Sequence, residues 1–363
     1  MKIGRLTLDG YNNYGNVLQN YALNIILGHH GKTETIWHTW ENFMPKAWWH
    51  WGWKEPIKFV LNYKGFRSRL FSDFHGMEMV RQGKIKDWCD RYIRIKKAPA
   101  DLFELADKYD YIVVGSDQVW NPYFSDLNHC FLLFIPPQKR IAYAASISCN
   151  EIPKEKLPLY RQGLDEMAFI SMREQQGADM VKQISGRDVP VLVDPTMLLL
   201  PDEWLKVSCQ PAWYHGEEYI LTYFLGKRPK VIDILEQETG LKVVNLLDTH
   251  VYEHYVTGPD EFLWAIRNAK LMYTDSFHGT VFSILFHTPF VVCDRIGSVV
   301  TEKMGARIDT LLEYFALENR RGTKNNGYII ENPLNEPDWS KVDDVLKRER
   351  DRAEEFLRQA LHL

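Results

Sequence analysis

The feature that most constrains this chain is the alternation of short apolar runs with longer segments of helical periodicity. Short strands separated by amphipathic helices are typical of repeated βαβ units, in which the sheets are mainly parallel. In the first half of the chain, this pattern predicts strands at residues 3–8, 111–114, 141–145, 169–172 and 189–193. After Tyr14, the segment VLQNYALNIIL has apolar residues at i and i+4, which predicts a helix with Asn16 as its N-cap. The fold class is therefore α/β.

A second series of the same kind follows a break in composition near residues 201–216, where proline and glycine interrupt regular structure. In this series we predict strands at 219–225, 243–247, 271–273 and 290–292, and helices after Pro229, after Pro259 and from about Thr280. The last residues form one amphipathic helix, with Ser340 and Asp343 as its capping box. These patterns predict an N-terminal domain at 1–205, a C-terminal domain at 216–335 and a C-terminal helix at 338–363.

Composition narrows the class of protein. Of 363 residues, 45% are apolar and 25% are charged, which is ordinary for a globular chain long enough for two domains. The formal net charge of −4 argues against a general nucleic-acid binder. Five cysteines without a C-x-x-C pair favour a reducing compartment over a disulfide framework, and no zinc site is legible. Because the sequence shows no signal peptide and no run of 18 apolar residues, we expect a cytoplasmic protein that needs no metal.

In open α/β sheets, ligands bind beyond the carboxyl ends of the strands, and two such domains in tandem place a cleft between them. The residues that follow each strand are therefore candidates for binding. After the first strand, Asn13, Gly15 and Asn16 lead into a helix N-terminus, whose free N–H groups favour an anion. A tight turn with a helix cap is the alternative interpretation of this loop.

Later strands of the first half also end on polar or small residues. Ser116 and Asp117 follow the run YIVV, and an Asx-turn is the alternative role of that carboxylate. Ser146 ends the run IAYAAS, where small residues permit a ligand to approach the backbone closely. Arg173 follows FISM, and its planar fork suits a phosphate or carboxylate. A surface ion pair with Glu174 is the alternative for this arginine.

The segment TDSFHGT, residues 274–280, separates a strand from a strongly apolar helix. Gly279 lets the backbone approach a ligand, and Ser276 and Thr280 add hydroxyl groups beside it. At a helix start, the helix dipole disfavours a cationic histidine unless an anion is present, so His278 is well placed as a general acid or as a donor to phosphate. A helix-capping histidine is the alternative. His287, within the apolar helix, is interpreted as structural.

Taken together, these segments resemble the polysaccharide pyruvyl transferase family over most of the chain. The resemblance rests on an ordered set of segments: NNYGNVLQNYAL, VVGSDQVWNP, ISMREQQG, VDPTMLL, YILTYFLG, TDSFHGTVFSILFHTPFVV and ARIDTLLEYFALENR. It implies a GT-B-like architecture of two Rossmann-like domains, with a C-terminal helix that crosses back to the first. It also implies transfer of a pyruvyl group from phosphoenolpyruvate to two hydroxyls of a sugar, which gives a cyclic ketal. No cofactor beyond this donor is implied.

The resemblance assigns roles to individual residues. His278 matches the family histidine that serves as proton donor or phosphate contact, and Arg173 matches an anion-binding arginine. Ser276 stands where the family motif has an arginine, so one expected cation is missing, and we expect its replacement to come from one of three residues: Arg295, Lys303 or Arg307. Asp117 is the candidate base for an acceptor hydroxyl. We expect His278→Ala and Arg173→Ala to abolish transfer and to leave the fold intact.

A region rich in tryptophan, residues 37–72, is unlike the rest of the first domain. Aromatic and basic residues together are typical of segments that lie at a membrane surface. Because acceptors of such enzymes are often lipid-linked, peripheral contact with the inner face of the membrane is one hypothesis. An insertion packed on the first domain and an aromatic floor for sugar rings are the two others.

Two other functions fit the same patterns. A GT-B glycosyltransferase that uses a nucleotide sugar would share the fold, since fold does not determine function. A non-catalytic binding protein of a glycan-assembly complex is compatible with Ser276 in place of arginine, whereas His278, Arg173 and Asp117 favour catalysis. The donor that the protein binds would separate these possibilities.

Overall fold

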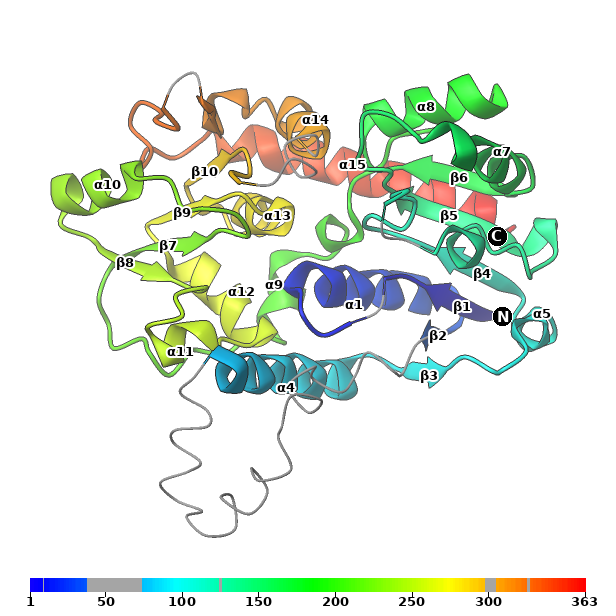
Figure 1. Ribbon diagram of the computed structural model, residues 1–363, viewed down its shortest axis with the longest axis horizontal. Coiled ribbons are helices and arrows are strands. Elements are labelled where there is room, and N and C mark those ends of the chain that lie inside the picture. Colours follow the sequence, from blue (N-terminus) through cyan, green and yellow to red (C-terminus); the bar gives the residue numbers. More distant parts are fainter. Residues whose placement is uncertain (9, 38–73, 124–125, 298–304, 325–326) are drawn as a thin grey trace, which may run out of the picture.

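The computed structural model describes residues 1–8, 10–37, 74–123, 126–297, 305–324 and 327–363. Two α/β units lie side by side, and helix α1 lies at their junction (Figure 1). Each unit contains one sheet whose strand pairs are all parallel. The predicted fold class, GT-B-like with two mainly parallel sheets and a C-terminal helix, is confirmed.

The first sheet has six strands in the order β3-β2-β1-β4-β5-β6. Its strands are β1 (Lys2–Leu6), β2 (Lys32–Trp37), β3 (Ile95–Lys97), β4 (Tyr111–Val114), β5 (Arg140–Ala145) and β6 (Phe169–Met172). The order reverses direction between β1 and β4, which is the place where open α/β sheets bind ligands.

The second sheet has five strands in the order β11-β10-β9-β7-β8. Its strands are β7 (Tyr219–Tyr223), β8 (Lys242–Asn245), β9 (Leu271–Thr274), β10 (Phe290–Cys293) and β11 (Arg321–Gly322). The three central strands are buried along their whole length, as expected for a parallel sheet covered on both faces.

The α-helices connect and cover these strands. Their bounds are α1 (Tyr14–Gly28), α4 (Phe74–Tyr92), α5 (Leu105–Lys108), α6 (Leu127–Cys130), α7 (Leu157–Asp165), α8 (Gln175–Ser185), α9 (Pro201–Leu205), α10 (Val231–Thr239), α11 (Tyr252–Tyr255), α12 (Pro259–Asn268), α13 (Phe277–Leu285), α14 (Ala306–Phe315) and α15 (Trp339–Ala360). One cluster of buried apolar side chains runs through both units by way of α1, α12, α13 and α15.

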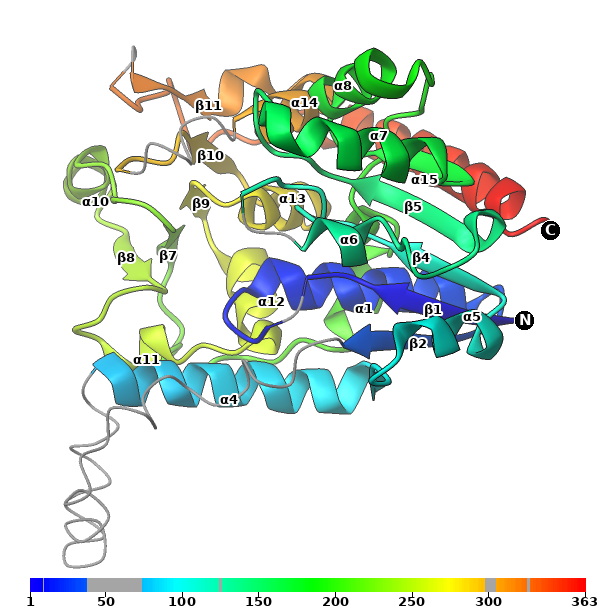
Figure 2. The same cartoon turned by 45° about the vertical axis from the view of Figure 1, so that its right-hand side comes forward.

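Two helices join the units. The C-terminal helix α15 begins near β10 and runs behind β5 and β6 (Figure 1), and its Phe356 packs on Tyr143 of β5 and Phe169 of β6. Helix α4 runs beneath both units in Figures 1 and 2. There Lys84 pairs with Glu261 of α12 at 2.7 Å. These contacts hold the two α/β units together, and with them the carboxyl ends of the strands in each sheet.

Several predicted elements differ from the observed ones. Residues 189–193 form no strand, because only Val191 makes a bridge, to Met172 at the end of β6. The prediction missed β2 and β3, whose sequences KTETIW and IKK are too polar or too short to form an apolar run. Trp37, placed in the tryptophan-rich region by sequence, is the buried last residue of β2. The rest of that region, residues 38–72, lies outside the described residues, as does Lys303.

Helix starts were the least accurate part of the prediction. Asn13, not Asn16, is the N-cap of α1, and its side chain accepts a hydrogen bond from Gly15 N at 2.8 Å. Helix α13 begins at Phe277 rather than near Thr280, because the Ser276 hydroxyl accepts a hydrogen bond from Gly279 N. His278 therefore lies in the first turn of the helix and not ahead of it.

The other end of α13 and the start of α15 also differ. His287 lies after α13, which ends at Leu285, and its Nε2 is 3.0 Å from Asp343 Oδ1 on α15. The expected capping box of α15 is wrong, since its N-cap is Asp338 and the Ser340 hydroxyl donates to that carboxylate at 2.7 Å.

Candidate functional site

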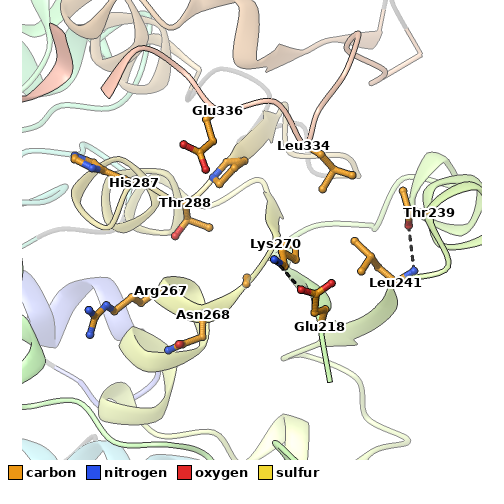
Figure 3. Close-up of a pocket in the computed structure, with 12 residues that line it drawn as sticks. Glu218, Thr239, Leu241, Arg267, Asn268, Lys270, His287, Thr288, Leu334 and Glu336 are labelled. Carbon is orange, nitrogen blue, oxygen red and sulfur yellow. Dashed lines mark hydrogen bonds and ion pairs between the residues drawn. The ribbon is translucent and has the colours of Figure 1, made fainter. Parts of the chain in front are cut away.

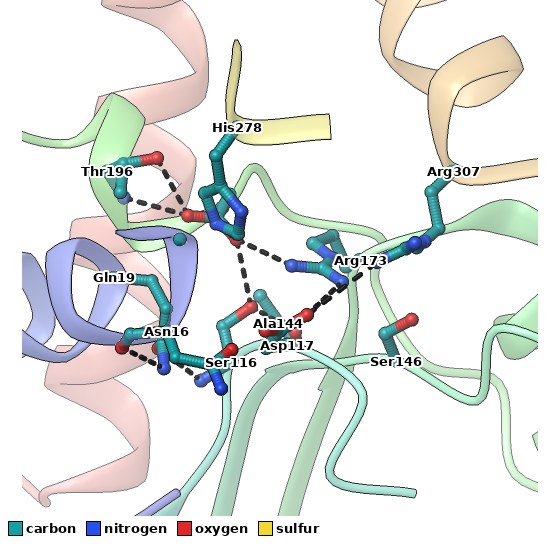
Figure 4. Close-up of polar contacts among 12 residues, drawn as sticks. Asn16, Gln19, Ser116, Asp117, Ala144, Ser146, Arg173, Thr196, His278 and Arg307 are labelled. Atoms are coloured by element: carbon teal, nitrogen blue, oxygen red, sulfur yellow. Dashed lines mark hydrogen bonds and ion pairs between the residues drawn. The ribbon is translucent and has the colours of Figure 1, made fainter. Parts of the chain in front are cut away.

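The carboxyl edges of the two sheets meet at a cluster of charged side chains (Figure 4). Asp117 follows β4, Arg173 follows β6, His278 lies in the first turn of α13, and Arg307 lies in the first turn of α14. Asp194 comes from the segment that follows α8. We call these five residues the Arg173 cluster. All five are nearly inaccessible to solvent.

Arg173 is held between two carboxylates. Its Nη1 donates to Asp194 Oδ2 at 2.8 Å, and its Nη2 donates to Asp117 Oδ1 at 3.1 Å. Both nitrogens of the fork are therefore occupied by the protein itself. The expectation that Arg173→Ala leaves the fold intact is changed by this geometry, because alanine would leave two buried carboxylates without their main partner.

Asp194 is the residue of the cluster that sequence reasoning missed. Its Oδ1 accepts from Thr196 N at 3.0 Å and from the Thr196 hydroxyl at 2.7 Å. Its Oδ2 accepts from Arg173 and lies 3.2 Å from the Ser116 hydroxyl and 3.6 Å from His278 Nε2. The signal in the sequence was the VDPT segment, where an aspartate before proline follows an apolar run.

Charge pairing decides the protonation of these groups. Burial opposes ionisation of Asp194, but His278 and Arg173 hold the pKa of its carboxyl well below the usual range. Asp117 behaves in the same way: burial would raise its pKa, and the neighbouring Arg173, His278 and Arg307 lower it. Burial also works against the Arg173 cation, yet the two aspartates raise the pKa of its guanidinium. Arg173 is therefore a cation between two ionised carboxylates, those of Asp117 and Asp194.

Gly15 sets the position of His278. A Cβ on Gly15 would lie 2.0 Å from His278 Nδ1, so the imidazole contacts α1 where only glycine leaves room. His278 Nε2 is buried and makes no hydrogen bond to any described residue, although Asp194 lies 3.6 Å away. The imidazole of His278, which belongs to the second unit, therefore packs against α1 of the first unit, and its Nε2 has no hydrogen-bond partner among the described residues.

Arg307 provides a second cation in the cluster. Its Nη1 lies 3.6 Å from Asp117 Oδ1, and its Nε is buried with no hydrogen-bond partner among the described residues. Phe277 lies beside both arginines, with its ring centroid 4.5 Å from Arg173 Cζ and 5.6 Å from Arg307 Cζ. Burial, and then repulsion by Arg173, lowers the pKa of the Arg307 guanidinium to about 10.

Arg295 lies apart from this cluster, beside a second buried aspartate. Asp275 accepts from Leu225 N and Gly226 N, each at 2.7 Å, and Arg295 Nε lies 3.5 Å from its Oδ2. Burial raises the pKa of the Asp275 carboxyl despite the opposing Arg295 charge and the two amides. Of the three candidates for the replacement cation, Arg307 lies in the Arg173 cluster and Arg295 lies beside Asp275, while Lys303 is outside the described residues.

Beneath the cluster, Arg5 of β1 supports the loop after β4. It is fully buried, and its Nη2 donates to Gly115 O at 2.8 Å. Gln19 of α1, which Arg5 also contacts, accepts from Ser116 N at 3.2 Å. Burial lowers the pKa of Arg5 to about 9 although Asp194 opposes the shift. Sequence reasoning had placed Arg5 inside a strand and gave it no role.

The remaining predicted residues mostly serve the protein backbone. Ser276 caps α13, and the buried Thr280 hydroxyl donates back to Ser276 O at 3.0 Å. Asn16 O accepts from Gln19 Nε2 at 3.0 Å inside the first turn of α1. Ser146 N donates to Asp117 O at 3.0 Å, which ties the turns after β4 and β5 together. These residues shape the site rather than offering free donors to it.

A pocket of about 690 Å³ lies elsewhere, at the opposite edge of the second sheet (Figure 3). Lys270, which pairs with Glu218 at 2.8 Å, lines this pocket and directly precedes β9, whereas His278 follows that strand. Of the residues that line the pocket, none belongs to the predicted site.

Two absences hold for the described part of the chain. There, no three histidine, cysteine or acidic side chains are grouped so that they could hold a metal ion. Within the same residues, no helix combines the length and apolar character that crossing a bilayer requires.

A family model described as polysaccharide pyruvyl transferase matches residues 13–296. A search of curated proteins finds no match.

Among solved structures, the chain is similar in shape to three bacterial proteins. They are UDP-GlcNAc 2-epimerase from Neisseria meningitidis bound to UDP-GlcNAc (11% identity, 96% of this chain and 100% of that chain covered, TM-score 0.39), MurG from Acinetobacter baumannii (10%, 99% and 94%, 0.40) and HepE from Anabaena in complex with UDP (8%, 100% and 100%, 0.45). The fold assignment rests on the strand order of this chain itself.

Proposed function

The chain belongs to the polysaccharide pyruvyl transferase family, and we propose that it transfers a pyruvyl group from phosphoenolpyruvate to two hydroxyls of a saccharide, forming a cyclic ketal and releasing phosphate. The observation that carries this proposal is the placement of His278. Its unused Nε2 lies within a frame that holds two guanidinium groups, those of Arg173 and Arg307. A proton donor beside cations is what this reaction needs.

The chemistry assigns a task to each group. C3 of the enol must gain a proton, and His278 is the donor at the junction of the two sheets. Phosphate must leave, and the buried Nε groups of Arg173 and Arg307, which have no hydrogen-bond partner among the described residues, are the donors proposed to bind it. Asp194 binds Arg173 and faces His278, so it orients both side chains and need not contact phosphoenolpyruvate itself.

Arg307 takes the place of the cation that the family motif has where this chain has Ser276. Ser276 is occupied as the N-cap of α13, and its short side chain is nearly inaccessible. Arg307 reaches the Arg173 cluster from α14 and has an unused Nε. A guanidinium supplied from another helix thus offers the same charge at the same edge.

A nucleotide-sugar glycosyltransferase is the second candidate, and one contact weighs against it. The turn after β7 presents the N–H groups of Leu225 and Gly226, which would suit a nucleotide phosphate. In this chain both N–H groups donate to the Asp275 carboxylate at 2.7 Å. An anion at this turn would have to displace a buried carboxylate, which favours phosphoenolpyruvate at the Arg173 cluster instead.

Calorimetric titration tests the proposal directly. We expect saturable binding of phosphoenolpyruvate to the wild-type protein and no comparable binding of nucleotide sugars. His278→Ala should weaken this binding and abolish phosphate release with saccharide acceptors. His287→Ala is the matched control, because His287 lies just past the same helix and pairs with Asp343 away from the cluster. Tight binding of a nucleotide sugar in place of phosphoenolpyruvate would transfer the assignment to the glycosyltransferase.

Arg173 needs a milder substitution than alanine. Arg173→Lys keeps a cation between Asp117 and Asp194 but loses the two-pronged geometry. We expect it to lower the rate of phosphate release more than the stability of the fold. A folded Arg173→Lys protein with full activity would remove the planar fork from the mechanism.

The acceptor is proposed to be a lipid-linked saccharide at the inner face of the membrane, reached through residues 38–72. This proposal rests on the aromatic and basic composition of that region alone. Sedimentation with vesicles of anionic phospholipid at low salt is the test. If the protein stays in the supernatant, this mode of docking is excluded.

A further inference from the structure

Glu174 is a buried carboxylate that the proposed chemistry does not yet use. It directly follows Arg173, and it is only 1% exposed. Its Oε1 accepts from the Ser146 hydroxyl at 3.0 Å, from Ile147 N at 2.9 Å and from Ser148 N at 3.2 Å. Its Oε2 is also buried, yet it has no hydrogen-bond partner within the described ranges. The two oxygens of one carboxylate are therefore used very unequally.

The neighbouring buried aspartates show that this inequality is unusual here. Both oxygens of Asp194 accept hydrogen bonds, and both oxygens of Asp275 do so as well. A buried acceptor left without a donor costs about 1–3 kcal/mol. A ligand hydroxyl that binds at Oε2 would supply the missing donor and remove this cost. Glu174 Oε2 is thus the carboxylate oxygen at this edge that a ligand would satisfy.

The charges around Glu174 favour a neutral donor. The four buried carboxylates of the site are balanced by four guanidinium groups: Asp117, Glu174, Asp194 and Asp275 against Arg5, Arg173, Arg295 and Arg307. At Oε2 itself, a cationic group would add unpaired charge beside the arginines, and an anionic group would be repelled by the Glu174 carboxylate. A hydroxyl group donates a hydrogen bond and carries no charge. Ser146 already places one hydroxyl on the opposite oxygen of this carboxylate.

We propose that Glu174 Oε2 binds one hydroxyl of the saccharide acceptor and takes its proton, an inference that rests on the proposed pyruvyl transfer. This role differs from that expected of Asp117. Asp117 Oδ1 is shared by Arg173 and Arg307, whose charges hold the pKa of that carboxyl below its usual range and so make it a weak base. Glu174 Oε2, by contrast, has no hydrogen bond and no ion pair with any described residue, so it is left for an acceptor hydroxyl. Because Oε2 is covered, acceptor binding must displace the side chain that covers it.

The proton transfers balance. The O–H bond of the first hydroxyl breaks, its proton passes to Glu174 Oε2, and its oxygen bonds to C2 of phosphoenolpyruvate. The C2=C3 electron pair takes a proton from protonated His278, which leaves a methyl group at C3. The C–O bond to phosphate then breaks with its electron pair on phosphate. The second hydroxyl oxygen bonds to C2, its proton goes to the phosphate, and Glu174 returns its own proton to His278 through solvent.

Glu174→Gln tests this role with little change in shape. The amide oxygen still accepts the three hydrogen bonds now made to Oε1, but the amide nitrogen at the other position cannot accept a hydroxyl proton. The matched control is Glu349→Gln on α15, since Glu349 is also 1% exposed and its Oε1 also has no hydrogen-bond partner among the described residues. Phosphate release from phosphoenolpyruvate is measured against a panel of methyl glycosides of common hexoses, and donor binding is measured by calorimetry.

We expect Glu174→Gln to lower kcat about 100-fold, which is the scale of a lost general base. Its Kd for phosphoenolpyruvate should stay within about twofold of the wild-type value. Glu349→Gln should leave both quantities unchanged. Glu174→Asp, which keeps a carboxylate on a shorter side chain, should recover part of the rate that Glu174→Gln loses.

The outcomes separate the two proposals. A Glu174→Gln protein that binds the donor and keeps its full rate would overturn the role of Glu174 and leave pyruvyl transfer standing. Loss of donor binding together with rate in Glu174→Gln would show a structural role for the carboxylate and also overturn the inference. A wild-type protein that does not bind phosphoenolpyruvate, or binds it and releases no phosphate with any glycoside, would overturn the proposed function and this inference with it.

Discussion

Asp194 is buried at the first of the two sheet edges that meet at the site, and Asp275 is buried at the second. The pKa values of these two carboxyl groups are shifted in opposite directions. At the first edge, Asp194 has Arg173 at 2.8 Å and three further polar contacts within 3.2 Å, and the pKa of its carboxyl is lowered. At the second edge, Asp275 has two backbone N–H groups and a more distant Arg295, and burial raises its pKa. Burial is similar, so charge pairing makes the difference.

This contrast separates groups that are paired within the protein from groups that keep an atom available to a ligand. The first edge is an ionised frame in which both nitrogens of the Arg173 fork are already paired. Among the described residues, buried atoms without a hydrogen-bond partner remain in both units: Glu174 Oε2 and Arg173 Nε in the first, and His278 Nε2 and Arg307 Nε in the second. Groups that are fully paired position others, whereas groups with spare donors are available to a ligand.

Neutralising each aspartate in turn tests whether the two carboxylates contribute differently to the stability of the fold. Asp194→Asn removes a charge on which buried Arg173 depends, and we expect it to lower the free energy of unfolding by about 3 kcal/mol. Asp275→Asn keeps an acceptor for one of the two backbone N–H groups, so we expect a loss of only about 1 kcal/mol. Urea denaturation monitored by tryptophan fluorescence measures both. Equal losses would show that the two carboxylates are equivalent.

The pH dependence of the same variants sharpens the contrast. Because the folded pKa of Asp194 is lowered, its stabilisation is present above the pKa of an unfolded aspartate, near 4, and is lost as pH falls below it. The advantage of wild type over Asp194→Asn should shrink by up to about 1.4 kcal/mol per pH unit below pH 4.

Asp275 should behave with the opposite sign. Its folded pKa is raised, so its contribution is largest below the unfolded pKa and is lost as pH rises through the folded value. Wild type should therefore gain on Asp275→Asn as pH falls. Denaturation series from pH 3 to 7 test both variants, and parallel curves would contradict the assignment of opposite shifts.

The smallest expected effect comes from a feature that the two edges share. Ser276 caps α13 and Asn13 caps α1, each through one side-chain hydrogen bond to a backbone N–H. Ser276→Ala and Asn13→Ala should each lower the free energy of unfolding by about 1 kcal/mol. Thermal denaturation of the two variants should give similar shifts. A much larger loss for Ser276→Ala would mean that this serine supports more than the start of its helix.

Much of the fold followed from local pattern. Strands at 111–114 and 169–172 were predicted with their observed bounds, because buried parallel strands appear as short apolar runs. The same pattern placed Asp117, Arg173 and His278 at strand ends, where the structure brings them together. Strands β2 and β3 could not be predicted in this way, because lysine, threonine and glutamate residues interrupt the apolar run that marks the other strands.

The α/β class, the family and the strand ends at which polar residues gather could all be predicted from the sequence, because they depend on residues close together along the chain. Which of those residues meet depends on how the sheets and helices pack. The roles of Asp194, Glu174 and Arg5 depend on partners far along the chain: Asp194 meets Arg173 at 21 positions, Glu174 meets Ser146 at 28, and Arg5 meets Gly115 at 110. Pairings over such separations are set by the packing of whole sheets and helices, and a buried charge takes its role from the partner that this packing provides.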